Sequence, residues 1–375
     1  MNSGSWAGFG SNTYLRSPHM NDLGYARAVS ERIAVVGAGA NGAAVGADLT
    51  RAGLDVTLIE QWPPHVEAMR ANGVRVEVQG PDGATEVETT PVRVHHLCEV
   101  AELRERFDAV MLLVKAYDTR WATELIVPLL ADDGLIAGVQ NGMTALEVAS
   151  IAGEARTLGT VIEVSSTMYE PGIVHRHTAR ESSWFAVGSL SPATRGREEE
   201  FAAILRQSGT VAVVDDILAA KWMKLVSNAS VLVPTAALGM PMADALAVPG
   251  MRDLMTRSGQ EALDVGQALG HRILPIFGLK PEDVASPETV VSTMLDTLYV
   301  GFVRPGATTT VLQDWTKGRR SEAGDLNGTV VAEGAATGVP TPVNAAVLEV
   351  ARRIEAGELR PGADNLALML DLAGG

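Results

Sequence analysis

The sequence predicts an α/β protein in two parts, an N-terminal doubly wound sheet followed by a C-terminal all-α domain. Three observations lead to this fold class. Short apolar runs alternate with helical segments as far as residue 215, which is typical of a parallel sheet covered by helices. A glycine-rich turn joins the first of these runs to a helix. From residue 216 onward, apolar residues recur at helical spacing and strand signals nearly vanish.

The first βαβ unit lies in residues 31–60. An apolar run at 33–36 leads into the turn Gly-Ala-Gly-Ala-Asn-Gly at 37–42, and a helical pattern follows to residue 52. A second apolar run, 56–59, ends at Glu60, which stands 18 positions after Gly42. Strand, glycine turn, helix, strand and terminal acid in this order are typical of a Rossmann-type domain that binds a dinucleotide.

Each residue of the turn has an expected role in this site. Gly37 allows a tight turn out of the strand, and Gly39 lets bare backbone approach a pyrophosphate. Gly42 lets the helix pack close to the strand. Ala40 and Asn41 complete the turn, where the first helical amides and the helix dipole favour phosphate. We therefore expect all five residues to form the cofactor site.

Glu60 bears on which dinucleotide binds. A carboxylate at this position can accept hydrogen bonds from the two hydroxyls of an adenosine ribose, whereas it repels a ribose phosphate. No basic residue follows at 61–64, so the sequence favours NAD. NADP stays an alternative because Arg70 or another distant base could reach the ribose, and FAD uses the same glycine pattern.

Composition narrows the class of protein further. The chain of 375 residues is long enough for two domains, and its net charge of −15 argues against nucleic acid or an anionic membrane as partner. No apolar run is long enough to span a bilayer. A single cysteine, Cys98, fits a reducing cytoplasm. Residues 1–30 lack a signal-peptide pattern and suggest a disordered leader or tag. We expect the rest of the chain to form two domains, a Rossmann domain at 31–215 and a helical substrate and dimerisation domain at 216–375.

Polar residues follow two buried strands of the predicted sheet. The strand at 107–114 ends at Lys115, and the strand at 135–139 ends at Gln140 and Asn141. Ligands bind at the carboxyl ends of parallel strands, so Lys115 and Asn141 are expected to face the cofactor. The alternatives are a solvated lysine and an ordinary Asn-Gly turn.

The remaining patterns complete the predicted fold. Residues 74–78 and 86–94 indicate a hairpin or a pair of edge strands, and 99–106 indicate a polar helix. His175 and His177 share a strand face, but no third ligand stands nearby in sequence, so no metal site is expected. The helices expected after residue 216 span 218–233, 243–247, 251–269, 287–299, 315–320, 322–337 and 342–357.

Two charged residues of the helical part are candidates for chemistry. Lys224 and Asn228 lie four residues apart on one face of a largely apolar helix. A buried lysine needs a carboxylate or a ligand to balance its charge, although its stem can also carry it to solvent. Glu322 stands where the helix 322–337 is expected to begin, a position that also favours an acid for purely structural reasons.

Five motifs occur in an order that resembles the ketopantoate reductase (2-dehydropantoate 2-reductase) family, over roughly residues 31–360. They are GAGANG at 37–42, VKAYDT at 114–119, QNGM at 140–143, KWMKLVSN at 221–228, and TTTVLQDW with KGRRSEAGDLNG between 308 and 328. The resemblance implies hydride transfer between NAD(P)(H) and a 2-oxo/2-hydroxy acid or related carbonyl/alcohol pair, with a small-molecule substrate. The extended helical part favours a homodimer.

The resemblance also implies roles for individual residues. Lys224 matches the catalytic lysine that protonates the keto oxygen, and Glu322 matches an acid that holds this lysine and contacts substrate. Asn228 and Thr310 match substrate-contacting positions, while Lys115 and Asn141 match residues that touch the cofactor and close the cleft.

The chain departs from the family pattern in three places. Leu232 replaces a second substrate-binding asparagine, Glu60 replaces a basic or small polar residue, and the segment 271–303 is longer than usual. The substrate is therefore open, and a catabolic NAD-dependent alcohol dehydrogenase acting on another substrate is one alternative. A dinucleotide-binding sensor without turnover is another, and it would have no use for a paired Lys224 and Glu322.

Overall fold

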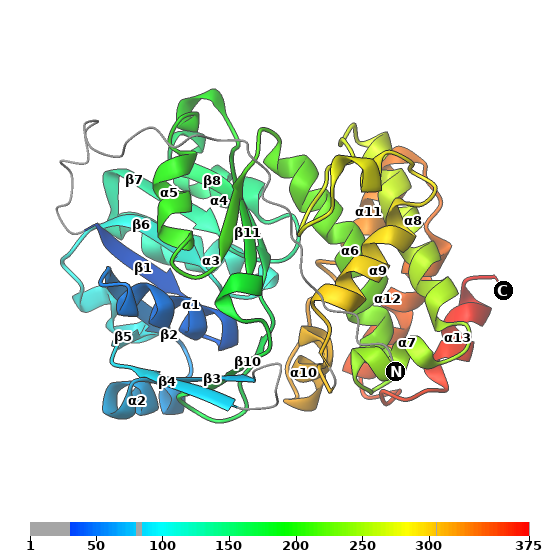
Figure 1. Ribbon diagram of the computed structural model, residues 1–375, viewed down its shortest axis with the longest axis horizontal. Helices are drawn as coiled ribbons and strands as arrows, with labels where there is room; N and C mark the ends of the chain where they lie inside the picture. The colour runs from blue at the N-terminus through cyan, green and yellow to red at the C-terminus, as the bar shows by residue number, and fades with distance from the viewer. Residues whose placement is uncertain (1–30, 80–84, 305, 375) are drawn as a thin grey trace, which may run out of the picture.

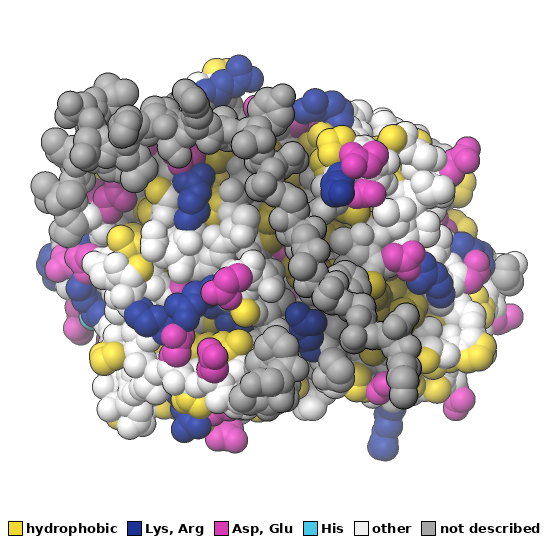
Figure 2. All heavy atoms as spheres, in the orientation of Figure 1, with side chains coloured by type: hydrophobic (Ala, Val, Ile, Leu, Met, Phe, Trp, Pro, Cys, Tyr) yellow, Lys and Arg dark blue, Asp and Glu magenta, His cyan; other side chains and the backbone are white. Residues whose placement is uncertain are grey.

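The computed structural model describes residues 31–79, 85–304 and 306–374, so the predicted leader at 1–30 lies outside the described residues. Two lobes lie side by side, one built on a large sheet and one built of helices (Figure 1). The expected fold class, a Rossmann-type doubly wound sheet with a C-terminal all-α part, is confirmed. Basic and acidic side chains are interspersed over the described surface on the face shown in Figure 2.

The large sheet has the strand order β12-β11-β8-β7-β6-β1-β2-β5. All neighbouring strands are parallel except the pair β8 and β11. The strands are β1 (Arg32–Val36), β2 (Asp55–Glu60), β5 (Arg93–His96), β6 (Phe107–Leu112), β7 (Leu130–Gly138), β8 (Thr157–Glu163), β11 (Trp184–Ser189) and β12 (Thr210–Val213).

Helices cover both faces of this sheet because its central strands are apolar on both sides. In β1, Ile33 and Val35 belong to the apolar cluster on the face of the sheet that α1 (Ala40–Arg51) and α5 (Glu198–Leu205) cover, α5 over β11 and β12. Ala34 and Val36 point the other way and belong to the cluster that includes side chains of α3 (Thr119–Ile126) and α4 (Ala145–Ala152). The covering helices also include α2 (Pro63–Asn72). The sheet is thus doubly wound, and its carboxyl edge stays open for a ligand.

A small second sheet has the order β4-β3-β10-β9, made of β3 (Val74–Gln79), β4 (Thr85–Thr90), β9 (Ser166–Thr167) and β10 (Ile173–Arg176). The predicted hairpin is confirmed as antiparallel β3 and β4. The extended run 86–94 is wrong as one strand, since Pro91 has no amide to donate and the chain passes there from β4 to β5. The polar helix expected at 99–106 is a 3₁₀ helix at Leu97–Glu102.

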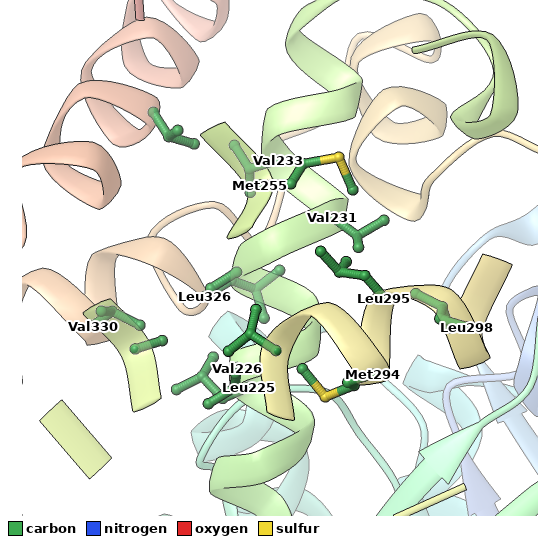
Figure 3. Close-up of a cluster of buried hydrophobic side chains, with 14 of the residues drawn as sticks. Leu225, Val226, Val231, Val233, Met255, Met294, Leu295, Leu298, Leu326 and Val330 are labelled. Carbon is green, nitrogen blue, oxygen red and sulfur yellow. The ribbon is translucent and has the colours of Figure 1, made fainter. Parts of the chain in front are cut away.

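The helical lobe is organised around α6 (Ile217–Ala237), which is buried along nearly its whole length. Around it lie α7 (Met242–Ala247), α8 (Met251–Ala268), α9 (Val290–Gly301), α10 (Thr310–Thr316), α11 (Asn327–Thr337), α12 (Pro342–Glu355) and α13 (Asn365–Leu372). Val226 and Val231 of α6 pack with Met255 of α8 and Leu295 of α9 (Figure 3). Within the described ranges, no helix is long and apolar enough to cross a membrane.

Two predicted helices of this lobe differ from the structure. Helix α10 begins at Thr310 instead of 315, because the Thr309 side chain caps it by accepting from the Leu312 amide at 3.2 Å. Helix α11 begins at Asn327, and Glu322 lies in the turns before it. Its carboxylate is therefore free to accept a hydrogen bond from the other lobe, as described below.

Candidate functional site

The glycine turn is shaped by backbone contacts. Gly37 has φ of 92°, and its amide donates to the Ile59 carbonyl at 2.8 Å. A Cβ at Gly37 would lie 2.7 Å from the Val114 nitrogen, and one at Gly42 would collide with the Gly37 carbonyl oxygen. A Cβ at Gly39 would meet nothing within 4 Å. The turn is thus closed where it packs and open at Gly39, which is where a pyrophosphate requires space.

A cleft of about 610 Å³ extends from this turn along the carboxyl edge of the sheet to the helical lobe. Most predicted cofactor residues line it: Gly37, Gly39, Ala40, Asn41, Glu60, Lys115 and Asn141. Gly42 does not line the cleft and instead packs the start of α1 against the turn. No side chain caps α1, so its first amides are available to an anion. These features fit a dinucleotide.

Glu60 ends β2 at the rim of the cleft. Its Oε1 accepts from the amides of Gln61 and Trp62, both at 2.9 Å, which holds the carboxylate in place. The helical lobe brings a cation to the same end, since the Arg319 guanidinium lies 5.7 Å from the centre of the Trp62 ring. Sequence reasoning missed Arg319. The basic run Lys-Gly-Arg-Arg at 317–320 was visible, but nothing local places it beside Trp62.

Lys115 joins the two lobes. Its ammonium donates to Asp314 Oδ2 at 2.6 Å and to Glu322 Oε2 at 3.3 Å, and Glu322 Oε1 accepts from the Ala116 amide at 2.9 Å. Burial opposes the charge of Lys115, but Glu322 and Asp314 together outweigh it, so the pKa of Lys115 is raised. Burial also raises the pKa of Asp314 in spite of the lysine beside it.

Lys224 is held by a different acid from the one expected. Its ammonium forms an ion pair with Glu163, the last residue of β8, and the Phe277 ring centre lies 5.5 Å from it. The expected pairing of Lys224 with Glu322 is not seen in this structure, where Glu322 instead binds Lys115 and the Ala116 amide. Lys224 is only 8% exposed, so it does not reach solvent along its stem.

A second hollow, of about 80 Å³, surrounds the Lys224 ammonium and adjoins the large cleft. Asn228 lines this hollow with Lys224, as their spacing predicts, and its Nδ2 donates to Asn141 Oδ1 at 3.0 Å. Thr310, Asn41 and Asn141 line both spaces. The buried Thr310 Oγ1 and Asn41 Oδ1 have no hydrogen-bond partner, which is unfavourable unless a ligand or water supplies one.

Lys221 is a buried cation that the sequence did not single out. Its ammonium donates to the carbonyls of Gln140, at 3.3 Å, and Thr160, at 3.0 Å, and so fastens α6 to the sheet beneath the site. Burial lowers the pKa of Lys221 to about 8. In the described part of the chain, no group of three or more His, Cys, Asp or Glu residues could hold a metal ion.

This burial predicts a pH-dependent stability. The pKa of Lys221 is lower in the folded than in the unfolded protein, so its charged form destabilises the folded protein below pH 8. This destabilisation disappears as the pH rises toward 10.5 and the lysine loses its proton in both states. We expect Lys221 to add on the order of 1–3 kcal/mol to the free energy of unfolding across this window. Lys221→Met should remove this rise, which urea titrations at pH 7, 8.5 and 10 would measure. An unchanged slope in the variant would contradict the assignment to Lys221.

Family models match both parts of the chain. The model described as ketopantoate reductase PanE/ApbA matches residues 33–190, and its C-terminal counterpart matches residues 216–355. The chain belongs to the ketopantoate reductase family. It is 30% identical to a 2-dehydropantoate 2-reductase of Mesorhizobium japonicum, covering 86% of this chain and 97% of that protein. The corresponding protein of Archaeoglobus fulgidus is 26% identical, with 87% and 99% covered.

Solved structures agree with the family. A PanE/ApbA family ketopantoate reductase from Ralstonia eutropha superposes with a TM-score of 0.72 at 27% identity, over 87% of this chain and 99% of that one. A D-mandelate dehydrogenase solved with NADH and anilino(oxo)acetate shares the fold with a TM-score of 0.74 at 19% identity, over the same fractions. As a member of this family, the protein is an NAD(P)-dependent oxidoreductase.

Proposed function

We propose that this ketopantoate reductase family member transfers a hydride between NAD(P)(H) and a 2-oxo/2-hydroxy acid or related carbonyl/alcohol pair, with Lys224 as the proton donor. The observation that carries the proposal is the position of Lys224: its ammonium is buried, paired with Glu163, and faces a hollow that adjoins the glycine-turn cleft. The bound nicotinamide would supply or accept the hydride.

The proposed chemistry of Lys224 follows from charge. When hydride adds to a carbonyl carbon, the π electron pair of the C=O bond moves to oxygen, and that oxygen takes a proton from the Lys224 ammonium. Before the proton moves, the positive charge stabilises the developing alkoxide. In the direction of alcohol oxidation, the neutral amine accepts the hydroxyl proton. Asn228 and Thr310 are proposed to hold the substrate, since both line the hollow.

Glu322 takes a different proposed role from the one that the resemblance implies. Glu322 lines the large cleft and binds Lys115 and the Ala116 amide, whereas Glu163 lines the smaller hollow and pairs with Lys224. We propose that Glu322 and Asp314 hold Lys115 against the cofactor space and keep the two lobes together. Asn141 is proposed to face the cofactor, and its contact with Asn228 links this edge to α6.

The cofactor is proposed to be NAD, held by Gly37, Gly39, Ala40 and Asn41 at the phosphates and by Glu60 at the ribose. The support is a buried carboxylate fixed at the end of β2. NADP is the alternative, and Arg319 near Trp62 is the residue that would favour it. If NAD is the cofactor, oxidation of an alcohol in a catabolic route becomes a second candidate direction.

Substituting Glu60 tests this choice. Glu60→Ser is expected to lower the ratio of NADPH to NADH dissociation constants by about 10–100-fold, because the repulsion of a ribose phosphate and the hydrogen bonds to the ribose are lost together. Fluorescence titration of both cofactors measures the ratio, and the exposed Glu358→Ser is the control. A wide preference of the parent for NADPH would refute the role given to Glu60.

The activity itself is tested by supplying the tighter-binding reduced cofactor with a panel of 2-oxo acids and uncharged carbonyl compounds. Oxidation of the cofactor with at least one of them supports the proposal. Tight cofactor binding without turnover on any of them, or on alcohols with the oxidised cofactor, would instead favour a dinucleotide-binding sensor. Yellow purified protein would indicate a flavin.

We also propose a cytoplasmic homodimer. The support is indirect: Cys98 is the single cysteine in the sequence, and the helical part is extended. Sedimentation of the purified protein measures the assembly directly. We also propose two domains, residues 31–215 and 216–375. The match to the first family model ends at residue 190 and the match to the second begins at residue 216, which supports a boundary there.

A further inference from the structure

The charges in the hollow around Lys224 are unusual for a site expected to take an anion. Among the described residues that line it, the charged side chains are Lys224 and Glu163, which pair with each other. The side chain of Lys224 is 10% exposed and that of Glu163 is 12% exposed. The positive charge that would attract a substrate carboxylate is thus already balanced before any substrate arrives.

We propose that Glu163 is a specificity-determining residue, which makes this hollow favour an uncharged carbonyl compound over a 2-oxo acid. The inference rests on the proposed function, because it takes Lys224 as the group that meets the carbonyl oxygen. The proposal goes further in stating which charge the substrate carries next to its carbonyl group. It also gives a role to Glu163, which belongs to neither the glycine turn nor the motif at 221–228.

A 2-oxo acid would bring a second carboxylate to the Lys224 ammonium. Its carboxylate is bonded directly to the carbonyl carbon, so an ammonium that donates to the carbonyl oxygen also lies close to the carboxylate. Glu163 is in contact with the same ammonium. Two carboxylates would then share one cation, and like charges at such separations repel strongly where water is excluded. An ester, amide, ketone or aldehyde places no second charge there.

The apolar part of the lining of the hollow strengthens this repulsion between carboxylates. One part of the lining is apolar, with Leu232, Leu298, Phe302 and Val303, and lowers the local dielectric response, while neutral polar side chains such as Asn228 and Thr310 line the rest. Leu232 is the position where the resemblance expects an asparagine. With this apolar group, the site has fewer donors to offer a carboxylate, and an apolar wall cannot replace a lost hydrogen bond.

Phe277 lies beside the Lys224 ammonium of the ion pair. It is 2% exposed, its ring faces the Lys224 ammonium, and its ring packs edge-on against Phe302 with centroids 5.7 Å apart. Within the described ranges, it is the non-glycine residue with positive φ, at 36°, a strained conformation that only the surrounding packing can maintain. Phe277 and Phe302 both belong to the long segment 271–303, which thereby forms part of the wall of this hollow.

The other cations of the site do not compensate for Glu163. Lys115 is balanced by two acids, Asp314 and Glu322. The large cleft, but not the hollow, is lined by three further cations: Arg319 over Trp62, Arg320 over Tyr117 and Lys317 over Tyr169. What remains at the junction of the two spaces is neutral: Thr310 Oγ1 and its buried neighbours Ser166 Oγ and Asn41 Oδ1 have no hydrogen-bond partner. The two hydroxyls can donate to a carbonyl or a carboxylate oxygen, and Asn41 Oδ1 can accept from a hydroxyl, but none of these groups brings a positive charge that would offset Glu163.

The test compares a 2-oxo acid with its own uncharged derivative, 3-methyl-2-oxobutanoate with its methyl ester, at saturating cofactor. For the parent protein we expect kcat/KM to be at least about 10-fold higher for the ester. In Glu163→Gln this ratio should fall by about 10–100-fold, mainly through a lower KM for the acid. Glu163→Asp keeps the charge and should keep the preference for the ester.

Each outcome decides the question. A parent protein that prefers the acid overturns the inference without any variant, even if Glu163→Gln fails to fold. Equal losses for acid and ester in Glu163→Gln would mean that Glu163 has only a structural role, and this also overturns it. Turnover of neither compound, nor of any carbonyl in the wider panel, would remove the proposed function and not only the role of Glu163.

Discussion

Lys224→Ala is expected to lower kcat by about 10²–10⁴-fold while the dissociation constant of the dinucleotide stays nearly unchanged. The variant loses both the proton donor and the charge that stabilises the alkoxide. It leaves the glycine turn and Glu60 intact, because Lys224 lines the smaller hollow and not the cleft at the turn. Steady-state kinetics and a fluorescence titration of the cofactor measure the two quantities separately.

Lys280→Ala is the matched control, since Lys280 is an exposed lysine of the same lobe that lines neither space. Its kcat should equal that of the parent. Thermal unfolding of Lys224→Ala must be recorded as well, because Glu163 loses its partner. Near-parental turnover in a folded Lys224→Ala protein would remove Lys224 from the mechanism.

Lys115→Ala is expected to lower the free energy of unfolding by about 3–5 kcal/mol. The Lys115 side chain is 31% exposed, but its partners Asp314 and Glu322 are 7% and 5% exposed and would be left as buried, unpaired acids. Since these contacts join the sheet lobe to the helical lobe, the cleft should also bind cofactor more weakly. Urea unfolding and cofactor titration measure the two effects.

The destabilisation caused by Lys115→Ala should be smaller at low pH. Burial already raises the pKa of Asp314, and removing the lysine beside it raises that pKa further, so protonation relieves the unpaired charge as the pH falls. Arg120→Ala is the control, because Arg120 is a well-exposed cation paired with Glu124 and Glu147, and its loss should cost less than about 1 kcal/mol. A similar small cost for Lys115→Ala would show that the Lys115 contacts do not hold the lobes together.

The parts of the site that could be predicted from sequence depend on short-range geometry. The glycine turn and Glu60 follow from a strand, a tight turn and a helix that are contiguous in the chain. Lys115 and Asn141 could be placed at one edge because parallel strands end on the same side of a sheet. Lys224 and Asn228 could be placed on one face because the helical repeat brings positions four apart together.

The sequence by itself therefore determined the fold class and most of the sheet-lobe residues that line the cleft, but not those that the helical lobe adds, such as Arg319. Only the tertiary structure decided which charges meet. Glu163 and Lys224 are 61 positions apart, and Lys115 and Glu322 are 207 apart. The resemblance implies that Glu322 holds Lys224, whereas in this structure Glu322 binds Lys115. An ion pair forms between whichever groups the packing of distant elements brings within a few ångströms, and neither hydrophobic periodicity nor motif spacing encodes that distance.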